Sequence, residues 1–201
     1  MKITSNHTEE KQDVVLWQAL KTGCSTALSE IARIHYANLL RYGLALGFDR
    51  EGVKDAIQNM FVYIWEHHET LSDVDNTKAY LLFALRNRLL REQKQTKREL
   101  TFWQRLCAEK KTQQSSDMDL VDLENDFENH QNIRQTLAQL PPREREVIQL
   151  RFYEGLDNEA IATIMGITKQ GVANLLVRTL KSFRAVWVEV VASVLLIFMN
   201  L

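Results

Sequence analysis

The chain has 201 residues, of which 45% are hydrophobic and 25% are charged, a balance typical of a folded globular protein rather than a disordered one. This length fits one large domain or two small ones. The formal net charge is −1, so the chain does not bind nucleic acid through an overall positive charge. Any such binding would depend on local clusters of basic residues.

The cysteines and the N-terminus argue against further classes of protein. Cys24 and Cys107 lie far apart without CxxC spacing, which argues against a disulfide framework or a zinc site. Residues 1–8 contain no apolar segment of the kind found in signal peptides, so we expect a cytoplasmic protein. We also expect no cofactor and no metal, and the adjacent His67 and His68 do not by themselves indicate a metal site.

The predicted elements of the first 98 residues are helices, because strand-like alternation and turn dipeptides are missing. One helix is expected over residues 26–46. The next has Asp49 as its N-cap and an apolar stripe, and a third carries apolar residues at helical spacing. The stripe consists of Ala56, Ile57, Met60, Phe61, Ile64 and Trp65, and the third helix carries Leu82, Leu85 and Leu89. We predict that residues 1–98 form a helical bundle.

Residues 99–132 differ in composition. Six basic residues occur between positions 86 and 98, whereas six acidic residues and no basic one occur between 117 and 128. Such a polar, acidic stretch is typical of a flexible linker. A second interpretation is that its negative charge imitates nucleic acid within a positively charged channel.

A second helical domain is predicted over residues 133–184. Pro141 and Pro142 precede a helix over 143–153, Asp157 caps a short helix, and Gly166 provides a sharp turn. Thr168 opens a longer helix. The apolar stripe of this last helix is Val172, Leu175, Leu176, Thr179, Leu180 and Phe183. The predicted fold class is therefore all-α, with two small domains joined by a flexible acidic linker.

A short helix, a tight turn and a longer helix with a polar outer face form the helix-turn-helix arrangement of DNA-binding proteins. Glutamine and asparagine pair with adenine edges and lysine with guanine, so Lys169, Gln170 and Asn174 are candidate base-reading residues. Arg178, Lys181 and Arg184 suit phosphate contacts. An ordinary amphipathic hairpin with a solvated basic face is the alternative explanation.

Five segments carry a resemblance to a known family. They are LPPREREVIQLRFYEGL at 140–156 with the following EAIA and MGIT, DAIQNMFVYIWE at 55–66, and YLLFALRNR at 80–88. In their order along the chain they resemble the extracytoplasmic-function (ECF) sigma factors of bacterial RNA polymerase. The resemblance covers about residues 17–184 in both domains. It implies a non-enzymatic protein that binds core polymerase at its clamp and flap regions, recognises promoter DNA and is held by an anti-sigma factor.

The resemblance also assigns residues. The implied polymerase-binding set is Asp55, Gln58, Asn59, Phe61, Val62 and Trp65. Phe61 and Trp65 lie on the apolar stripe, and for these two we favour a place in the core. The implied minus-ten set is Asp75, Asn76 and Thr77, which would capture a flipped base, with Tyr80, Arg86, Asn87, Arg88 and Arg91. Tyr80 fits base stacking and helix packing equally.

The implied minus-thirty-five set is Thr168, Lys169, Gln170, Ala173, Asn174, Arg178 and Lys181. Many relatives carry a basic residue where this chain has Ala173 and Leu175, which predicts weaker phosphate affinity here. A free-standing helix-turn-helix regulator is the competing function, and a structural helical adaptor is a third. The segment that resembles the polymerase-binding helix argues against the regulator.

The apolar tail, residues 185–201, fits none of these roles. As a helix it spans about 25 Å, less than the bilayer core of about 30 Å, which argues against a membrane span. We expect it to pack on the C-terminal domain or on a partner.

Overall fold

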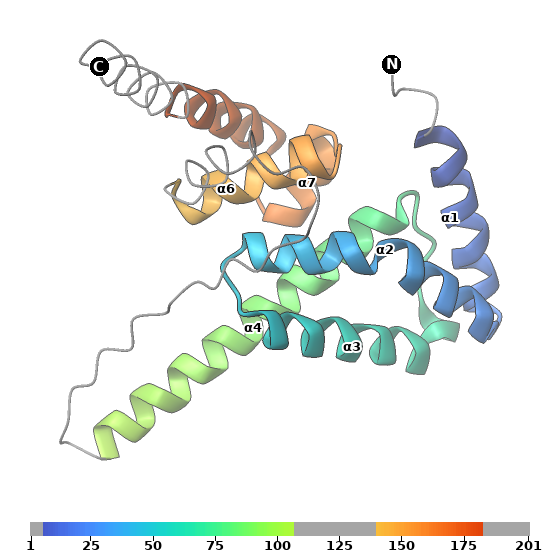
Figure 1. Ribbon diagram of the computed structural model, residues 1–201, viewed down its shortest axis with the longest axis horizontal. Helices are drawn as coiled ribbons and strands as arrows, with labels where there is room; N and C mark the ends of the chain where they lie inside the picture. The colour runs from blue at the N-terminus through green and yellow to red at the C-terminus, as the bar shows by residue number, and fades with distance from the viewer. Residues whose placement is uncertain (1–5, 107–139, 183–201) are drawn as a thin grey trace, which may run out of the picture. The chain divides into compact units, whose positions relative to one another are not determined.

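The computed structural model describes residues 6–106 and 140–182, with side chains described over 12–95 and 140–182. The chain divides into two compact units, Met1–Asp119 and Leu120–Leu201. Every regular element in the described part of the chain is helical, which confirms the predicted all-α class (Figure 1). The apolar tail and residues 107–132 of the predicted linker lie outside the described residues.

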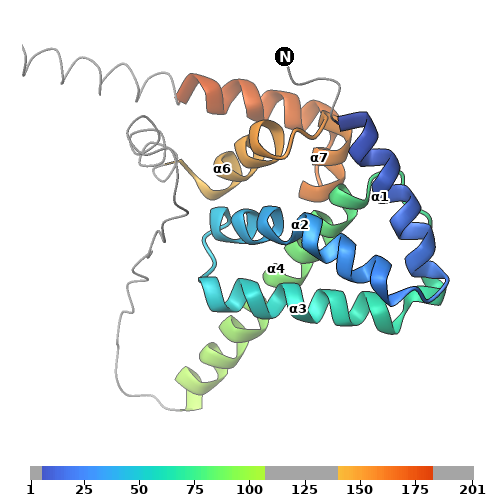
Figure 2. The ribbon, with the colours of Figure 1, turned by 45° about the vertical axis from the view of Figure 1, so that its right-hand side comes forward.

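The described residues of the first unit, 6–106, form four α-helices and one short 3-10 helix. They are α1 (Asn6–Lys21), α2 (Ser25–Ala45), α3 (Arg50–Glu66), η1 (His68–Thr70) and α4 (Thr77–Leu106). Helices α2 and α3 run side by side and α4 crosses them in both views (Figures 1 and 2). Helix α4 continues past residue 98, into the stretch that its composition suggested as linker.

The core of the first unit consists of side chains from all four α-helices. Trp17, Ile31, Ile57 and Leu85 are each at most 1% exposed. Burial of a large apolar side chain stabilises a fold by about 1.5–3 kcal/mol, so these residues account for much of the packing energy. Helix α1 is tied to α2 as well by a buried polar pair, in which Nε2 of His35 lies 3.0 Å from a carboxylate oxygen of Asp13.

A glycine determines how closely α2 and α3 approach. A Cβ atom at Gly43 would overlap the methyl groups of Val53, which is fully buried on α3. The turn between the two helices begins at Gly47, whose φ of 88° is readily adopted only by glycine. The predicted N-cap at Asp49 is confirmed, since its Oδ1 accepts from the amide of Gly52 at 2.8 Å.

The second unit contains α6 (Pro142–Ile148), the π-helix η2 (Gln149–Tyr153), α7 (Asn158–Met165) and the helix Lys169–Ser182. The single helix expected over 143–153 is therefore an α-helix that widens into a π-turn. Within that turn Leu150 is fully buried, whereas Phe152 is 60% exposed. The core is completed by Val147, Ile161, Ile164 and Val172, each at most 1% exposed.

Candidate nucleic-acid interface

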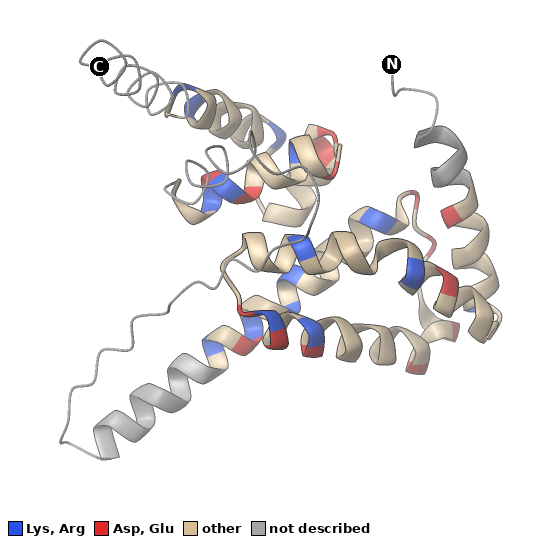
Figure 3. Ribbon diagram, in the orientation of Figure 1, with Lys and Arg blue, Asp and Glu red and all other residues tan. Residues whose placement is uncertain are grey.

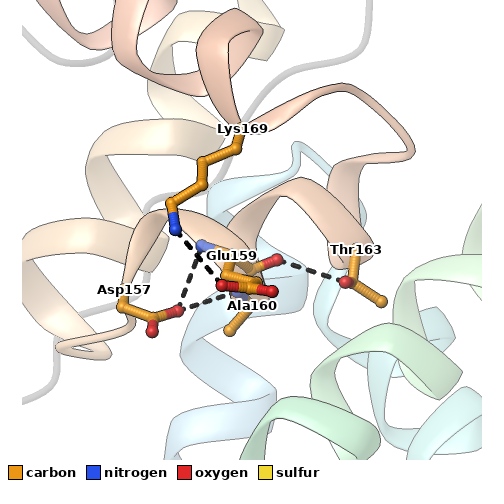
Figure 4. Close-up of polar contacts among 5 residues, drawn as sticks. All are labelled: Asp157, Glu159, Ala160, Thr163 and Lys169. Carbon is orange, nitrogen blue, oxygen red and sulfur yellow. Dashed lines mark hydrogen bonds and ion pairs between the residues drawn. The ribbon is translucent and has the colours of Figure 1, made fainter.

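The helix-turn-helix is built by local hydrogen bonds that the sequence anticipated. Oδ1 of Asp157 accepts from the amides of Glu159 and Ala160 at 3.1 and 2.8 Å, which caps α7 (Figure 4). Gly166 ends α7 in the left-handed conformation with φ 64°, and Oγ1 of Thr168 accepts from the amide of Gly171 at 3.0 Å. The helix that follows crosses α7 at 97°.

The outer face of the helix Lys169–Ser182 carries the predicted minus-thirty-five residues. Ala173 is half-buried, and the other six are exposed, namely Thr168, Lys169, Gln170, Asn174, Arg178 and Lys181. The opposite side packs inward through Val172, Leu175 and Thr179. One assignment to the apolar stripe was wrong, because Leu180 is 47% exposed, and Phe183 lies outside the described residues.

Most of these exposed side chains are already paired within the chain. Nζ of Lys169 lies 3.2 Å from a carboxylate oxygen of Glu159 on α7 (Figure 4). Nε2 of Gln170 donates to Oδ1 of Asn174, one helical turn later, at 3.0 Å. The polar groups of this face are therefore held in position by their partners. The spacing of residues in the sequence did not predict these partners.

Arg178 has a partner of a different kind. Its Nε donates to Oε1 of Glu144 on α6 at 3.0 Å. The carboxylate side chain is only 7% exposed, whereas the arginine side chain is 68% exposed. The pair fixes the Nε side of the guanidinium against the domain and leaves most of the side chain in solvent.

The predicted minus-ten residues fall into two groups in the structure. Asp75 is exposed. Asn76 caps α4, since its Oδ1 accepts from the amide of Ala79 at 2.8 Å. Thr77 is 1% exposed and its hydroxyl donates to the backbone oxygen of Asp13 at 3.4 Å. The expectation that Thr77 reads a base edge therefore conflicts with its place in the core.

The second group lines a hollow between α3 and α4. The hollow measures about 440 Å³, and its walls include Tyr63, Tyr80, Asn87, Arg88 and Arg91. Tyr80 packs edge-on against Trp17 with ring centroids 5.0 Å apart, so it serves helix packing while still lining the hollow. Burial raises its pKa above the ordinary tyrosine value. Tyr63, which is 53% exposed, was not among the residues predicted from the sequence.

Basic residues occur along α4, as the blue segments in the described part of this helix show in Figure 3. Arg91 is exposed, whereas Arg86 and Arg88 are half-buried. Nε of Arg88 donates to a carboxylate oxygen of Glu92 at 3.1 Å, one turn further along the helix. The helix therefore offers a basic surface beside the aromatic hollow, a combination suited to single-stranded nucleic acid.

The predicted polymerase-binding residues share the exposed side of α3. Asp55, Gln58, Asn59 and Val62 are all exposed. The core interpretation of Phe61 and Trp65 was wrong, because both are half-buried and line a surface groove between α2 and α3. The groove measures about 600 Å³.

The far wall of this groove comes from α2. Leu28, Ala32 and Tyr36 line it at a spacing of four residues. That spacing was the signal that would have identified the second wall, since side chains four residues apart share one face of a helix. These three residues were not among the site residues predicted from the sequence.

Neither a membrane span nor a metal centre is found in the part of the chain that the structure describes. No single helix there combines the length and apolar character that a crossing requires. Among the described helices, only α7 and the helix Lys169–Ser182 together have the required length and apolar character, and this pair is bent by 97°. Within the same residues, no three histidine, cysteine, aspartate or glutamate side chains are grouped as metal ligands.

Comparisons with known proteins agree with this geometry. Residues 130–183 match the family described as sigma-70, region 4. The ECF RNA polymerase sigma factor SigL of Mycobacterium tuberculosis is 26% identical over 151 residues, which cover 75% of this chain and 82% of the relative. The match to region 4 spans the whole helix-turn-helix described above.

Two solved structures share the fold. CnrH in complex with the cytosolic domain of CnrY matches with a TM-score of 0.59 at 18% identity, over 88% of this chain and 97% of that one. The sigma factor RpoE in complex with the anti-sigma factor NepR from Bartonella quintana matches with a TM-score of 0.58 at 19% identity. This match covers 78% of this chain and 94% of that one. The helical fold is therefore shared with these two structures.

The helix-turn-helix lies within the segment that matches sigma-70, region 4, and the helical fold is that of the two solved structures. The resemblance to the ECF sigma factors that the sequence motifs indicate is confirmed.

Proposed function

We propose that this chain is an ECF-type sigma factor, which binds core RNA polymerase, recognises promoter DNA and directs transcription initiation. The observation that carries the proposal is the outer face of the helix Lys169–Ser182, where exposed base-reading side chains follow a capped turn. Its N-terminal turns present Lys169, Gln170 and Asn174, the residue types that pair with guanine and adenine edges in the major groove.

The first unit supplies the polymerase contact in this proposal. The apolar groove between α2 and α3 includes two half-buried aromatic residues, Phe61 and Trp65. Buried aromatic anchors dominate the energetics of protein interfaces, and exposed polar side chains beside them form the rim. Asp55, Gln58 and Asn59 are such polar neighbours on α3. We assign this face to the clamp of the polymerase's largest subunit.

We also propose that an anti-sigma factor binds this chain. One structural relative was solved with the anti-sigma factor NepR, and the other with the cytosolic domain of CnrY. A partner that covers the groove between α2 and α3 would compete with polymerase for Trp65. The chain itself carries out no chemistry in this proposal, and it works in the cytoplasm together with the polymerase.

Run-off transcription tests the proposal. The full chain is added to core polymerase with promoter fragments that include the region upstream of its own gene. We expect a discrete transcript that needs both proteins, and loss of polymerase binding in a Trp65→Ala variant. A Tyr153→Ala variant is the matched control, because Tyr153 is an exposed aromatic residue of the other unit. Tight DNA binding by the chain alone, without polymerase binding, would instead identify a free-standing regulator.

A further inference from the structure

Helix α1 contacts the loop of residues 71–76, which joins η1 to α4, at two successive residues. Nε1 of Trp17 donates to the backbone oxygen of Ser72 at 3.1 Å. Nε2 of Gln18 donates to Oδ1 of Asp73 at 2.9 Å, and the ammonium of Lys21 pairs with the same oxygen. One face of α1 therefore holds the middle of the loop.

The same helix also holds the end of the loop where α4 begins. The backbone oxygen of Asp13 accepts from the hydroxyl of Thr77, and the ring of Trp17 packs against the edge of Tyr80. Asp13 is in turn fixed to α2 through His35. The loop thus rests on a helix that is itself anchored in the core of the unit.

These contacts divide into buried and exposed ones. Trp17 is fully buried, so its removal would damage the fold. The side chain of Asp73, in contrast, is 74% exposed and that of Lys21 is 22% exposed. Exposed ion pairs contribute little to folding stability, because solvent screens them and ordering two side chains costs entropy. The pair of Lys21 and Asp73 instead restricts the position of the loop.

The carboxylate is in its charged form for this contact. Hydrogen bonds from Lys21 and then from Gln18 lower the pKa of Asp73 below the ordinary aspartate value. Because the lowered pKa lies far below neutral pH, Asp73 accepts both donors throughout the range in which transcription is measured. Two donors from successive turns of α1 converge on one oxygen, which limits the rotation of the loop side chain.

We propose that Gln18 and Lys21 are positioning residues for promoter recognition, which hold Asp73 and thereby place the loop of residues 71–76 for contact with DNA. The inference rests on the proposed function. The loop presents Asp75 to solvent and ends at Asn76, two of the predicted minus-ten residues. A loop already held in its DNA-binding arrangement loses less conformational entropy when DNA binds, which strengthens binding without a new contact.

The test uses the full chain with core polymerase on two templates, a duplex promoter and the same promoter with an unpaired minus-ten segment. We expect Lys21→Ala and Gln18→Ala to lower open-complex formation on both templates by about threefold to tenfold, the equivalent of ordering one or two side chains. Polymerase affinity and Tm should stay as in the wild type. Thr22→Ala is the matched control, because its hydroxyl bonds only to the backbone of Ala19.

Further variants separate positioning from a general loss of structure. Lys21→Arg keeps the positive charge and should retain activity. Lys21→Asp and Asp73→Lys should each lower open-complex formation, and their combination should restore it, since the reversed pair joins the same two positions. Hydrogen exchange of the loop amides should accelerate in Lys21→Ala and return to the wild-type rate in the combined variant.

The outcomes distinguish this inference from the proposed function. A chain that never binds core polymerase overturns both. Normal polymerase binding together with unchanged open-complex formation in Lys21→Ala and Gln18→Ala overturns the positioning role alone. The positioning role is also overturned if hydrogen exchange of the loop amides in Lys21→Ala stays at the wild-type rate, even when transcription changes.

Discussion

At the scale of single residues, the predicted base-reading side chains are paired with one another or with neighbours. Gln170 and Asn174 share a hydrogen bond of 3.0 Å, and Lys169 lies near Glu159. All four are exposed, so the pairs cost little to break when DNA supplies better partners. Pairing of this kind holds each side chain near one rotamer, which favours a definite base preference.

Asn174→Ala tests the reading role directly. If Asn174 contacts a base edge, the substitution should cost about 1–3 kcal/mol on the preferred minus-thirty-five sequence and much less on sequences altered at that position. Competition binding of holoenzyme to a panel of single-base promoter variants measures this difference. An equal loss on every sequence would reassign Asn174 to positioning of Gln170 or to folding.

Arg178 and Lys181 form a matched pair for a second prediction. Loss of either charge should weaken DNA binding on all sequences and reduce the slope of log affinity against log salt by about 0.9. Only Arg178→Ala leaves the buried carboxylate of Glu144 without its partner, so it alone should also destabilise the domain by about 1–3 kcal/mol. Denaturant unfolding of both variants checks this, and equal stability would mean that water replaces the guanidinium.

At the scale of elements, the sequence predicted helices and caps well because these depend on local signals. Asp49, Asp157 and Thr168 accept the amide bonds expected of N-caps, and Gly166 has the expected positive φ. The π-turn after α6 was not predicted, because the apolar spacing of residues 143–153 is compatible with a continuous α-helix.

Burial within a helix was harder to predict than the helix itself. An apolar stripe that is wider than the core leaves some members at the surface, and Phe61 and Trp65 line a groove for this reason. Thr77 shows the opposite error, since a polar residue taken for a base reader is buried against α1. Both outcomes depend on contacts between helices distant in sequence, which periodicity along one helix does not specify.

The packing of α1 on α4 gives a pH prediction. Burial against Trp17 raises the pKa of Tyr80, so the folded chain keeps the phenol proton at a pH where the unfolded chain releases it. As the pH rises from about 10, the ordinary tyrosine value, toward the raised pKa, the free energy of unfolding should therefore fall.

Tyr80→Phe isolates this contribution. The variant keeps the ring that packs on Trp17 and lacks the titrating hydroxyl, so its stability should fall less steeply above pH 10 than that of the wild type. Urea unfolding at several pH values between 8 and 11 measures both slopes. Identical slopes would mean that the phenol is as accessible to solvent in the folded chain as in the unfolded one.

At the scale of the whole molecule, two units each carry part of the predicted promoter contact. The helix-turn-helix belongs to one unit, and the hollow beside Arg88 and Arg91 belongs to the other. Neither pattern alone would have indicated more than DNA binding. Their order along one chain, with the segments 55–66 and 80–88 ahead of the helix-turn-helix, is what indicated the resemblance to sigma factors in the sequence.

The division into two units leads to a last prediction. Substitutions at sites that share no partner add in free energy to within about 0.3–0.5 kcal/mol. Asn174 lies in the second unit and Arg91 in the first, and each faces solvent. The losses of promoter affinity from Asn174→Ala and Arg91→Ala should therefore sum in the double variant.

Holoenzyme binding to a full promoter, and to fragments that retain only one of the two elements, measures each loss separately. On a fragment without the minus-ten element, Arg91→Ala should have no sequence-dependent effect, while Asn174→Ala should keep its full effect. A double variant that loses much less than the sum would mean that the two contacts depend on each other. The first unit would then engage the minus-ten element only when the second unit has bound its own element, and promoter reading would be one coupled step.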